Sequence, residues 1–271
     1  MNNLEMFCLA IDDHVLNKIS LLDYTPVGLG ERNYTSKNLS DNIGENISFK
    51  NEYYGEYTFH YWLWKNNFNN IPNNKWIGFC AYRRFWQKEK GKKKKILSFK
   101  DNILNSVNQD WEKYDVILGD QTSLENIKWI KVIKYGKLAF VRNPLAIFKS
   151  GRTIRFQFDM FHGNGVLDKA ISLLNDNDRD DFRYFVRNKT SYNQGNMFIC
   201  KSKKIMNSYY ETIFEWLEKC EEVFGFNLKG YGNIRIYAFL AERFLPFWFN
   251  KYCKVLEWPV IFYDLKENDI K

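Results

Sequence analysis

The chain has 271 residues, of which 45% are hydrophobic and 18% aromatic, and its 40 Lys and Arg residues exceed its 32 Asp and Glu residues, giving a net charge of +8. This length and apolar content suit one large globular domain with a sizeable core. A short peptide module and a mainly disordered chain are therefore excluded.

The sequence shows no targeting or membrane-spanning pattern. No stretch approaches the roughly 20 apolar residues that a membrane helix needs, and residues 1–14 lack the basic start and long apolar region of a signal peptide. We therefore expect a cytoplasmic protein.

The cysteine and histidine contents argue against a metal centre. The five cysteines are scattered and form no Cys-x-x-Cys pair, so we expect reduced, buried thiols rather than disulfides or structural zinc. A catalytic site of three histidines would need all three histidines of the chain to converge. We expect no metal site built from these residues.

A strongly basic segment, residues 88–95, holds six lysines and one glutamate. One interpretation is a solvated loop between two strands, because the segment has no apolar face. The other is attraction to an anionic membrane surface or another polyanion. Nucleic acid is a weaker candidate, since no aromatic residue interrupts the lysines and no nucleic-acid motif accompanies them. We expect no nucleic-acid partner.

The first part of the chain contains two apolar runs, residues 5–11 and 76–81, which predict strands. Residues 54–66 are apolar or aromatic almost all round, which predicts a buried helix. The Pro, Gly, Asn and Ser residues within 23–46 predict an ordered loop.

The rest of the chain also alternates between strand and helix patterns. Residues 127–141 fit either a strand or a helix. The other predicted elements, in chain order, are a helix at 98–111, a strand at 115–118, a segment at 155–174 with His162 in a glycine-flanked loop followed by a helix, a polar linker at 175–181, a strand at 196–200, an amphipathic helix at 202–223, a glycine-rich turn at 225–232 and an aromatic helix at 234–249 kinked at Pro246. This alternation predicts an α/β sandwich in one domain without repeats.

Tyr82, Arg83 and Arg84 follow directly on the second predicted strand. Consecutive arginines at the end of a hydrophobic strand are costly unless each guanidinium meets an anion or water. Phosphate is the natural anion, because the planar guanidinium matches its oxygens and ligands dock at the carboxyl ends of such strands. The structural alternative is a salt bridge, for which the candidate partners are Glu56, Asp120 and Glu242.

Five blocks of the sequence resemble a known family in order and spacing. They are NISFKN at 46–51, GEYT at 55–58 with YWLWKN at 61–66, IGFCAYRRF at 77–85, NMF at 196–198 and FLAER at 239–243. The family is the bacterial domain-of-unknown-function family four-four-two-two, which is met among the polysaccharide glycosyltransferases of capsule and O-antigen clusters. The resemblance runs from about Pro26 to Phe249.

The resemblance implies a GT-A-like fold, a Rossmann-type mixed sheet flanked by helices in a single domain over residues 1–271. A nucleotide-binding half would cover about 1–125 and an acceptor half about 126–271. In many GT-A enzymes the strand after a buried helix ends in Asp-x-Asp, whose carboxylates hold Mg²⁺ or Mn²⁺. Here that strand ends in Ala81-Tyr82-Arg83-Arg84, so guanidinium groups could neutralise the leaving UDP, and we favour a site without metal ligands.

The resemblance also implies donor-binding residues. Two positions depart from the family, because Ala81 replaces a usual His and Gly55 a usual Cys. The structural alternatives are an Asn-stabilised loop at residues 50–51 and an ordinary turn at 26–28. The implied donor-binding residues are Pro26, Gly28, Lys50, Asn51, Glu56, Tyr82, Arg83 and Arg84.

Transfer with inversion needs a base for the acceptor hydroxyl. Glu242 is the first candidate, because it matches the family's Glu-Arg pair on a helix that is otherwise apolar. A structural pair with an arginine is the alternative role for this residue. The other catalytic candidates are His162, for which a structural role is an equal alternative, Asp120 and Asp159. The expected acceptor or sugar-binding residues are Asn193, Asn196, Arg235 and Arg243.

These observations predict a glycosyltransferase that moves a sugar, galactofuranose or another hexose, from a UDP-sugar to a membrane-tethered bacterial surface glycan. The lysine run and the final aromatic helix would then contact the inner face of the cytoplasmic membrane. One alternative is a non-catalytic module that binds polyanions or lipids on a degenerate transferase fold. An RNA-binding or nucleotidyl-transfer protein is less favoured, because paired aspartates and a glycine-rich phosphate loop are missing.

Overall fold

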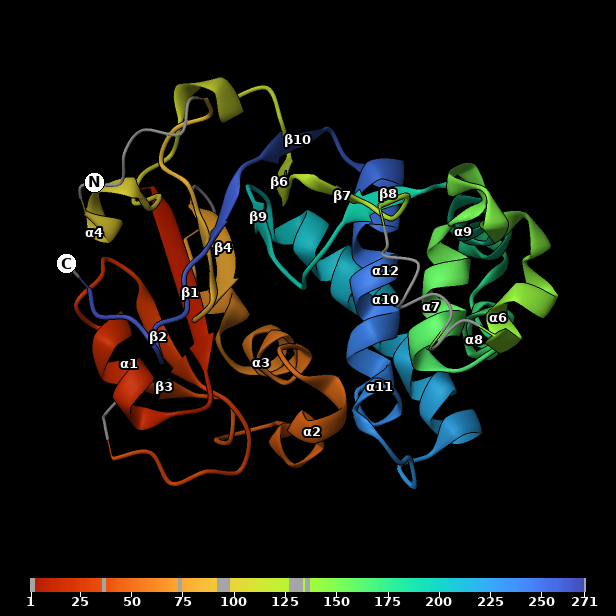
Figure 1. Ribbon diagram of the computed structural model, residues 1–271. Helices are drawn as coiled ribbons and strands as arrows, with labels where there is room; N and C mark the ends of the chain where they lie inside the picture. The colour runs from red at the N-terminus through yellow and green to blue at the C-terminus, as the bar shows by residue number, and fades with distance from the viewer. Residues whose placement is uncertain are drawn as a thin grey trace. The chain divides into compact units, whose positions relative to one another are not determined.

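The computed structural model describes residues 3–35, 38–72, 75–91, 98–126, 134 and 137–270. The chain divides into two compact units whose sequence ranges interleave (Figure 1). Unit 1 comprises Met1–Asp120, Gly195–Tyr210 and Phe249–Lys271, and unit 2 comprises Gln121–Gln194 and Glu211–Trp248. Each unit is described by itself.

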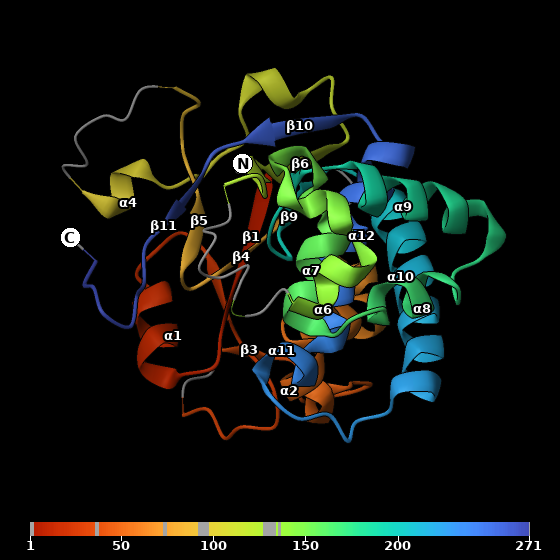
Figure 2. The ribbon, with the colours of Figure 1, turned by 45° about the vertical axis from the view of Figure 1, so that its right-hand side comes forward.

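Unit 1 is built on a mixed sheet that has nine strands in the described part of the chain. The strands are β1 (Leu4–Ala10), β2 (Thr25–Gly28), β3 (Leu39–Ser40), β4 (Trp76–Ala81), β5 (Arg84–Trp86), β6 (Val116–Gly119), β9 (Phe198–Cys200), β10 (Val255–Trp258) and β11 (Val260–Phe262). Their order is β10-β6-β9-β4-β1-β2-β3, and β5 pairs with both β4 and β11. Figure 2 shows β11 beside β5.

Strand direction defines one functional edge of this sheet. The strands β1, β2, β3 and β4 are parallel, whereas β9 is antiparallel to both β4 and β6. The carboxyl ends of β1, β2, β3, β4 and β6 therefore share an edge with the amino end of β9. From β1 the chain goes to β2 and β3 and then returns to β4 on the other side of β1. This reversal is a topological switch point, where ligands of α/β proteins bind.

Helices cover both faces of the sheet. Successive side chains of β1 point to opposite faces, and both sets are mainly apolar, so both faces need a covering layer. Phe7 contacts Phe59 and Phe79 with ring centroids 5.2 and 5.9 Å apart, whereas its neighbour Cys8 packs in a separate buried cluster with Leu16. The helical segments of unit 1 are α1 (Asp13–Ile19), η1 (Ser48–Lys50), α2 (Asn51–Tyr54), α3 (Tyr57–Trp62), the π-helix η2 (Leu63–Asn67), η3 (Phe68–Asn70), α4 (Phe99–Asn102) and η4 (Gln109–Trp111).

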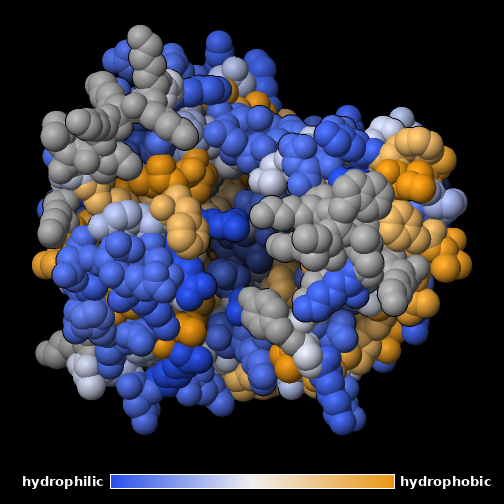
Figure 3. Space-filling model, in the orientation of Figure 1, coloured by the Kyte–Doolittle hydropathy of each residue, from blue (hydrophilic) through white to orange (hydrophobic). Residues whose placement is uncertain are grey.

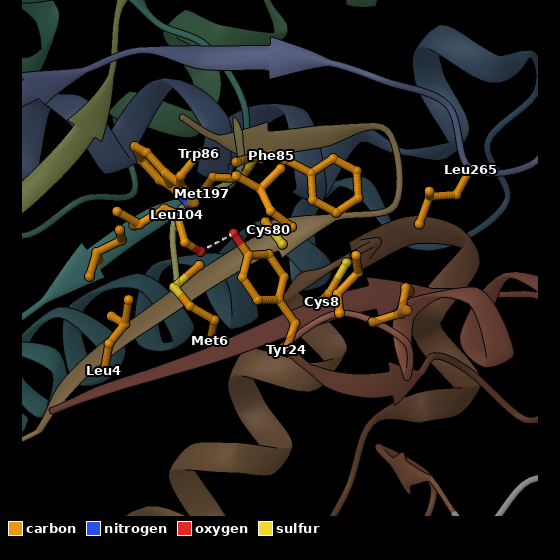
Figure 4. Packing of buried hydrophobic residues seen from close by; sticks show 14 of the residues in the cluster. Leu4, Met6, Cys8, Tyr24, Cys80, Phe85, Trp86, Leu104, Met197 and Leu265 are labelled. Atoms are coloured by element: carbon orange, nitrogen blue, oxygen red, sulfur yellow. Dashed lines mark hydrogen bonds between the residues drawn. The ribbon is translucent and has the colours of Figure 1, made fainter. Parts of the chain in front are cut away.

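The buried cluster that contains Cys8 and Leu16 also holds a polar contact. Figure 4 shows the hydroxyl of Tyr24 among Met6, Cys80 and Leu104, donating a hydrogen bond of 2.6 Å to the Leu104 carbonyl. Burial raises the pKa of this hydroxyl, so it stays protonated and remains a donor. In the same way the indole of Trp86 donates to the Phe79 carbonyl at 2.9 Å.

Unit 2 is mainly helical. Its core places Phe182 against Phe247, Phe244 and Trp216, at centroid distances of 4.9, 5.2 and 5.9 Å. Its elements are β7 (Gln121–Ser123), α6 (Lys137–Arg142), η5 (Pro144–Ile147), η6 (Lys149–Gly151), α7 (Ile154–His162), α8 (Val166–Ile171), α9 (Asp176–Asn188), β8 (Ser191–Asn193) and α11 (Tyr231–Ile234), with parts of α10 (Lys203–Phe224) and α12 (Ile236–Tyr252). Figure 2 shows α6 beside α7, and the rings of Phe140 and Phe156 join these helices.

The predicted α/β fold with a mixed sheet flanked by helices is confirmed. The apolar runs correspond to β1, β4, β6 and β9, and the amphipathic and aromatic helices correspond to α10 and α12. The helix predicted at 54–66 is present but is interrupted at Gly55, whose φ of 55° allows α2 and α3 to turn.

Several other predictions are wrong. The loop predicted at 23–46 contains β2 and β3, which are too short to give a periodic pattern, and Pro26 lies inside β2. The linker predicted at 175–181 begins α9, because the side chain of Asn175 caps this helix. Most of the helix predicted at 98–111 is irregular, since only α4 and η4 form there. The strands β10 and β11 were not predicted.

The expected membrane contacts also change. The aromatic helix α12 buries most of its side chains, so it is a core helix and not a membrane contact. Lys92–Lys95 lie outside the described residues, as do residues 127–133, 135 and 136 of the segment that fitted either a strand or a helix. Residues 137–142 of that segment form α6. No helix among the described residues is both long and apolar enough to cross a membrane.

All five cysteines lie in the described part of the chain and none forms a disulfide. Cys8, Cys80, Cys200 and Cys220 are buried, as predicted, and Cys253 is half-buried. Burial raises the pKa of Cys80, Cys200, Cys220 and Cys253, the last to about 12.

Replacing Tyr24 by Phe tests the buried contact with Leu104. We expect Tyr24→Phe to lower the free energy of unfolding by about 1–2 kcal/mol, because the Leu104 carbonyl loses its donor in a buried environment. Chemical denaturation of the two proteins measures this difference. The exposed Tyr184 provides the control, since Tyr184→Phe should leave the stability unchanged.

Candidate functional site

The carboxyl edge of the sheet in unit 1 gathers charged side chains around the switch point. Asp12 follows β1, Asp41 follows β3, Tyr82 and Arg83 follow β4, and Asp120 follows β6. We take this edge, with the turn between β4 and β5, as the candidate site.

The two arginines are held differently. The Nε atom of Arg83 lies 2.9 Å from an oxygen of Asp264, while its side chain remains 50% exposed and its guanidinium lies 4.9 Å from the centre of the Tyr82 ring. Asp264, which the sequence did not single out, is therefore the anionic partner of Arg83. No residue pattern pointed to Asp264, because it lies in the C-terminal segment that was not predicted to join this edge.

Arg84 opens β5 and is exposed. Its side chain makes no ion pair or hydrogen bond with another described residue. A Cβ atom at Gly195 would lie 3.0 Å from Nη1 of Arg84, so a larger residue there would crowd the guanidinium. Gly195 also has a φ of 98°, which L-residues rarely adopt. The backbone at Gly195 thus leaves room for an exposed cation at the edge of the sheet.

Two acidic side chains that follow β1 have partners within the protein. Asp12 accepts from the backbone N–H groups of His14 and Val15 and caps α1. Asp13 accepts from the N–H and the hydroxyl of Thr35, both at 3.0 Å. In the part of the chain that the structure describes, no group of three or more His, Cys, Asp or Glu side chains is placed to hold a metal ion.

Asp41 is a buried carboxyl that the sequence analysis missed. It is fully buried, accepts a hydrogen bond of 2.8 Å from the Gly30 N–H, and follows the shortest strand of the edge. Burial raises its pKa from the ordinary 3.8 to about 6. Only the placement of β3 reveals this residue, because its neighbours in the sequence resemble an ordinary polar loop.

The other expected donor-binding residues surround this carboxyl and the helices after it. A Cβ atom at Gly28 would lie 2.4 Å from the ring of Tyr34, so glycine is required there. Asn51 donates to the Gly55 carbonyl and the Thr58 hydroxyl, and so stabilises the turn between α2 and α3. Three further expected residues also lie in this part of the chain. Pro26 lies in β2 and pairs with Cys8 of β1. Lys50 lies near the Phe49 and Tyr54 rings, and Glu56 precedes α3.

Unit 2 contains a second charged cluster around Arg243. The Arg243 side chain is 2% exposed and its guanidinium lies 5.3 Å from the centres of both the Phe158 and Tyr192 rings. Nη1 donates to the carboxylate of Glu242, and Nη2 donates to the Gln157 side chain at 2.9 Å. The Glu242 side chain is 18% exposed, so the buried cation orients a side chain that is only partly buried.

His162 supports this cluster and has no ring nitrogen open to a substrate. Its Nδ1–H donates to the Gly232 carbonyl at 2.9 Å, which leaves Nε2 to accept from Nη2 of Arg243 at 3.4 Å. The ring also stacks on Phe239 at 3.9 Å. Burial and then the Arg243 guanidinium lower the pKa of His162 to about 3, so the ring is neutral. In this arrangement His162 holds the Arg243 guanidinium in place, and a catalytic role of His162 stays a prediction.

The remaining candidates have separate places. Asp159 is buried and accepts from the Gly165 N–H at 2.8 Å, which makes it a structural residue. Asp120 is exposed after β6, and Asn196 precedes β9 on the same edge of unit 1. In unit 2, Asn193 is buried in β8, and Arg235 follows α11.

The predicted residues are divided between the two units. Unit 1 contains the expected donor-binding residues with Asp120 and Asn196. In unit 2, contacts of Arg243 join Glu242 and His162.

The strand order and its switch point define an α/β fold of the doubly wound class. The chain belongs to the family described as "Domain of unknown function (DUF4422)", whose model matches residues 14–253, so the predicted family is confirmed. No curated protein matches the chain.

Among solved structures, the fold is similar to that of WbbM, a bifunctional glycosyltransferase, in its apo form. The TM-score is 0.68 with 19% sequence identity, and the match covers 96% of this chain. This chain spans less than half of WbbM, since the match covers 45% of the WbbM chain. At this identity the match establishes the fold.

The raised pKa of Asp41 predicts a pH dependence of stability. Between pH 4 and 6 the folded protein binds one proton more than the unfolded chain, so stability falls as the pH rises through this range. Over about two pKa units the loss is roughly 3 kcal/mol. Asp41→Asn keeps an oxygen for the Gly30 N–H and cannot ionise.

Chemical denaturation of both proteins at pH 4, 5, 6 and 7 tests this prediction. The free energy of unfolding of the parent, minus that of Asp41→Asn, should decrease across the series. A constant difference would contradict the assignment.

Proposed function

We propose that this chain is a glycosyltransferase that moves a hexose from a UDP-sugar to a membrane-tethered bacterial surface glycan. The similarity of its fold to that of a bifunctional glycosyltransferase supports a transferase role, as does the sequence pattern of the family. The donor sugar we propose is galactofuranose or another hexose. The acceptor we propose is a growing glycan or lipid-linked glycan of capsule, O-antigen or exopolysaccharide, extended on the cytoplasmic side.

The observation that carries the proposal is the pair Arg83 and Arg84 at the switch point of the sheet. Guanidinium groups match phosphate oxygens in a bidentate manner, and Arg84 is exposed without a protein anion among the described residues. Arg83 shares its charge with Asp264 but is half-exposed, so one face of its guanidinium is open to solvent. Two cations placed here would hold the diphosphate of the donor.

The same arginines would stabilise the leaving UDP. Cleavage of the sugar–phosphate bond leaves negative charge on the diphosphate, and fixed cations lower the barrier by meeting that charge as it develops. Our proposal routes no step through a metal ion, because β4 ends in Ala81-Tyr82-Arg83-Arg84 and not in an Asp-x-Asp pair. Mg²⁺ or Mn²⁺ dependence is the competing possibility.

Glu242 is our proposed base for the acceptor hydroxyl. Arg243 fixes its carboxylate in one orientation, and burial of that cation keeps water away from one side of the pair. A base of this kind removes the hydroxyl proton as the oxygen attacks the anomeric carbon, and attack opposite the leaving group inverts that centre. We therefore propose an inverting transfer.

Substitution of the arginines tests donor binding. We expect Arg83→Ala and Arg84→Ala each to weaken UDP binding by roughly ten- to one-hundred-fold, because each removes a charge-assisted contact to phosphate. Calorimetric titration of UDP in EDTA measures the affinities. The exposed ion pair of α9 provides the control, since Arg183→Ala should not change UDP binding.

The outcomes separate the alternatives. Binding that persists in EDTA and depends on both arginines supports the proposal, whereas binding that requires added Mn²⁺ would show that carboxylate ligands have been missed. Absence of UDP binding under both conditions would favour the non-catalytic module for polyanions or lipids.

Substitution of Glu242 tests the proposed base. We expect Glu242→Gln to reduce acceptor-dependent release of UDP from a UDP-hexose by roughly one-hundred-fold or more while the UDP affinity stays the same. The exposed Glu215 of α10 provides the control, and Glu215→Gln should retain activity. Unchanged turnover by Glu242→Gln would assign this carboxylate to a structural pair with Arg243.

A further inference from the structure

A segment of unit 2, residues 138–148, exposes an unusual number of large apolar side chains. In the described part of the chain, twelve large hydrophobic residues are exposed, and five of them fall within these eleven residues. They are Leu138, Val141, Leu145, Ile147 and Phe148, with exposed fractions of 59% to 79%. Figure 3 shows hydrophobic surface gathered at the right-hand edge, the part of unit 2 where Figure 1 shows α6.

The segment inverts the usual distribution of large and small side chains. Ala139 and Ala146 point inward and are buried with Phe156 and Met160, and the half-buried Phe140 packs against the same cluster, while the other large apolar residues of the segment point outward. A segment that served only to fill the core would bury the larger residues, because the hydrophobic gain grows with buried area. The arrangement therefore indicates that the outer apolar surface is buried against something else.

The backbone beneath this surface is firmly held. Asn143 donates from its side chain to the Ala139 carbonyl at 3.0 Å, and Arg152 donates to the Glu125 carbonyl at 2.7 Å. A Cβ atom at Gly151 would lie 2.0 Å from the Leu145 carbonyl oxygen, so the chain passes too closely there for any other residue. These contacts fix the backbone of the segment, so the exposed apolar side chains are held in defined positions.

The charge around the segment indicates its partner. Between Glu125 and Asp159 the sequence contains no acidic residue but eight basic ones: Lys128, Lys131, Lys134, Lys137, Arg142, Lys149, Arg152 and Arg155. The remainder of the chain carries equal numbers of basic and acidic residues, so the excess of this stretch equals the whole net charge of +8. Among the basic residues whose side chains the structure describes here, Lys134 and Lys149 are exposed, whereas Arg142 and Arg155 pair with Asp168 and Arg152 is buried. Exposed apolar side chains beside these two lysines match a surface that offers both acyl chains and negative headgroups.

We propose that residues 138–148 form a docking surface for an anionic lipid bilayer. Leu145, Ile147 and Phe148 enter the boundary between headgroups and acyl chains, and the exposed Lys134 and Lys149 contact the headgroups. This surface differs from the two membrane contacts expected from the sequence. It does not depend on the UDP site, which lies in unit 1.

The test compares matched variants in vesicle sedimentation. We expect the parent to bind vesicles of phosphatidylcholine that contain about a third phosphatidylglycerol, and to bind pure phosphatidylcholine much less. The double variant Leu145→Ser/Phe148→Ser should bind the anionic vesicles roughly ten-fold less tightly, because two exposed apolar anchors are lost. The control Leu21→Ser/Tyr184→Ser removes two apolar side chains of similar exposure elsewhere and should bind like the parent.

The charge contribution has its own pair of variants. Lys149→Gln should weaken binding by roughly five-fold, whereas Lys189→Gln, an exposed lysine outside the basic stretch, should leave it unchanged. Binding should also fall when the salt concentration rises from about 0.1 to about 0.5 M, as electrostatic attraction is screened.

Four results would overturn the proposal. They are equal sedimentation of the parent and Leu145→Ser/Phe148→Ser, equal binding to neutral and anionic vesicles, absence of vesicle binding by the parent, and dimers of the parent that this double variant dissociates. The last would identify a second copy of the chain as the occupant. Calorimetric titration of UDP into the same variants keeps this test separate from the proposed function, because the double variant should bind UDP like the parent.

Discussion

The parallel pairing of β1 with β4 is the constraint on which the candidate donor site depends. Six consecutive residue pairs, from Leu4 with Trp76 to Leu9 with Ala81, fix the register of two buried strands. A shift of one residue would move each side chain of β4 to the opposite face, which packing on both faces forbids. The register therefore determines where the buried apolar run stops and the Tyr82–Arg84 turn begins.

The two units use arginine in opposite ways. Arg84 is a solvated cation whose charge is available at the edge of a sheet, and Gly195 leaves it space. Arg243 is desolvated among aromatic rings and is paired with Glu242, an arrangement in which removal of either partner leaves an uncompensated charge. The first suits recognition of an anion that arrives from solution. The second suits permanent orientation of a neighbouring carboxylate.

The sequence was informative where a residue pattern has a direct physical meaning. The continuous apolar runs identified β1, β4, β6 and β9, because strands buried on both faces need apolar side chains throughout. The arginines stood out because their charge directly follows such a run. Asp41 and Asp264 could not be found, since their surroundings come from β3 and from the C-terminal strands, which are too short to be recognised. The sequence left both a catalytic and a structural role open for His162, because its glycine-flanked position resembles a loop. Only the structure shows the packing against Arg243 and Phe239 that makes it a buried neutral ring.

The burial of the thiols has a practical consequence for studying this protein. A thiol reacts with alkylating reagents and oxidants through its thiolate, and burial disfavours that form at Cys80, Cys200, Cys220 and Cys253. The cysteines of the folded protein should therefore react very slowly with a maleimide. A cysteine placed on an exposed residue would then dominate the labelling, so spectroscopic probes can be attached at chosen positions without first removing the native cysteines.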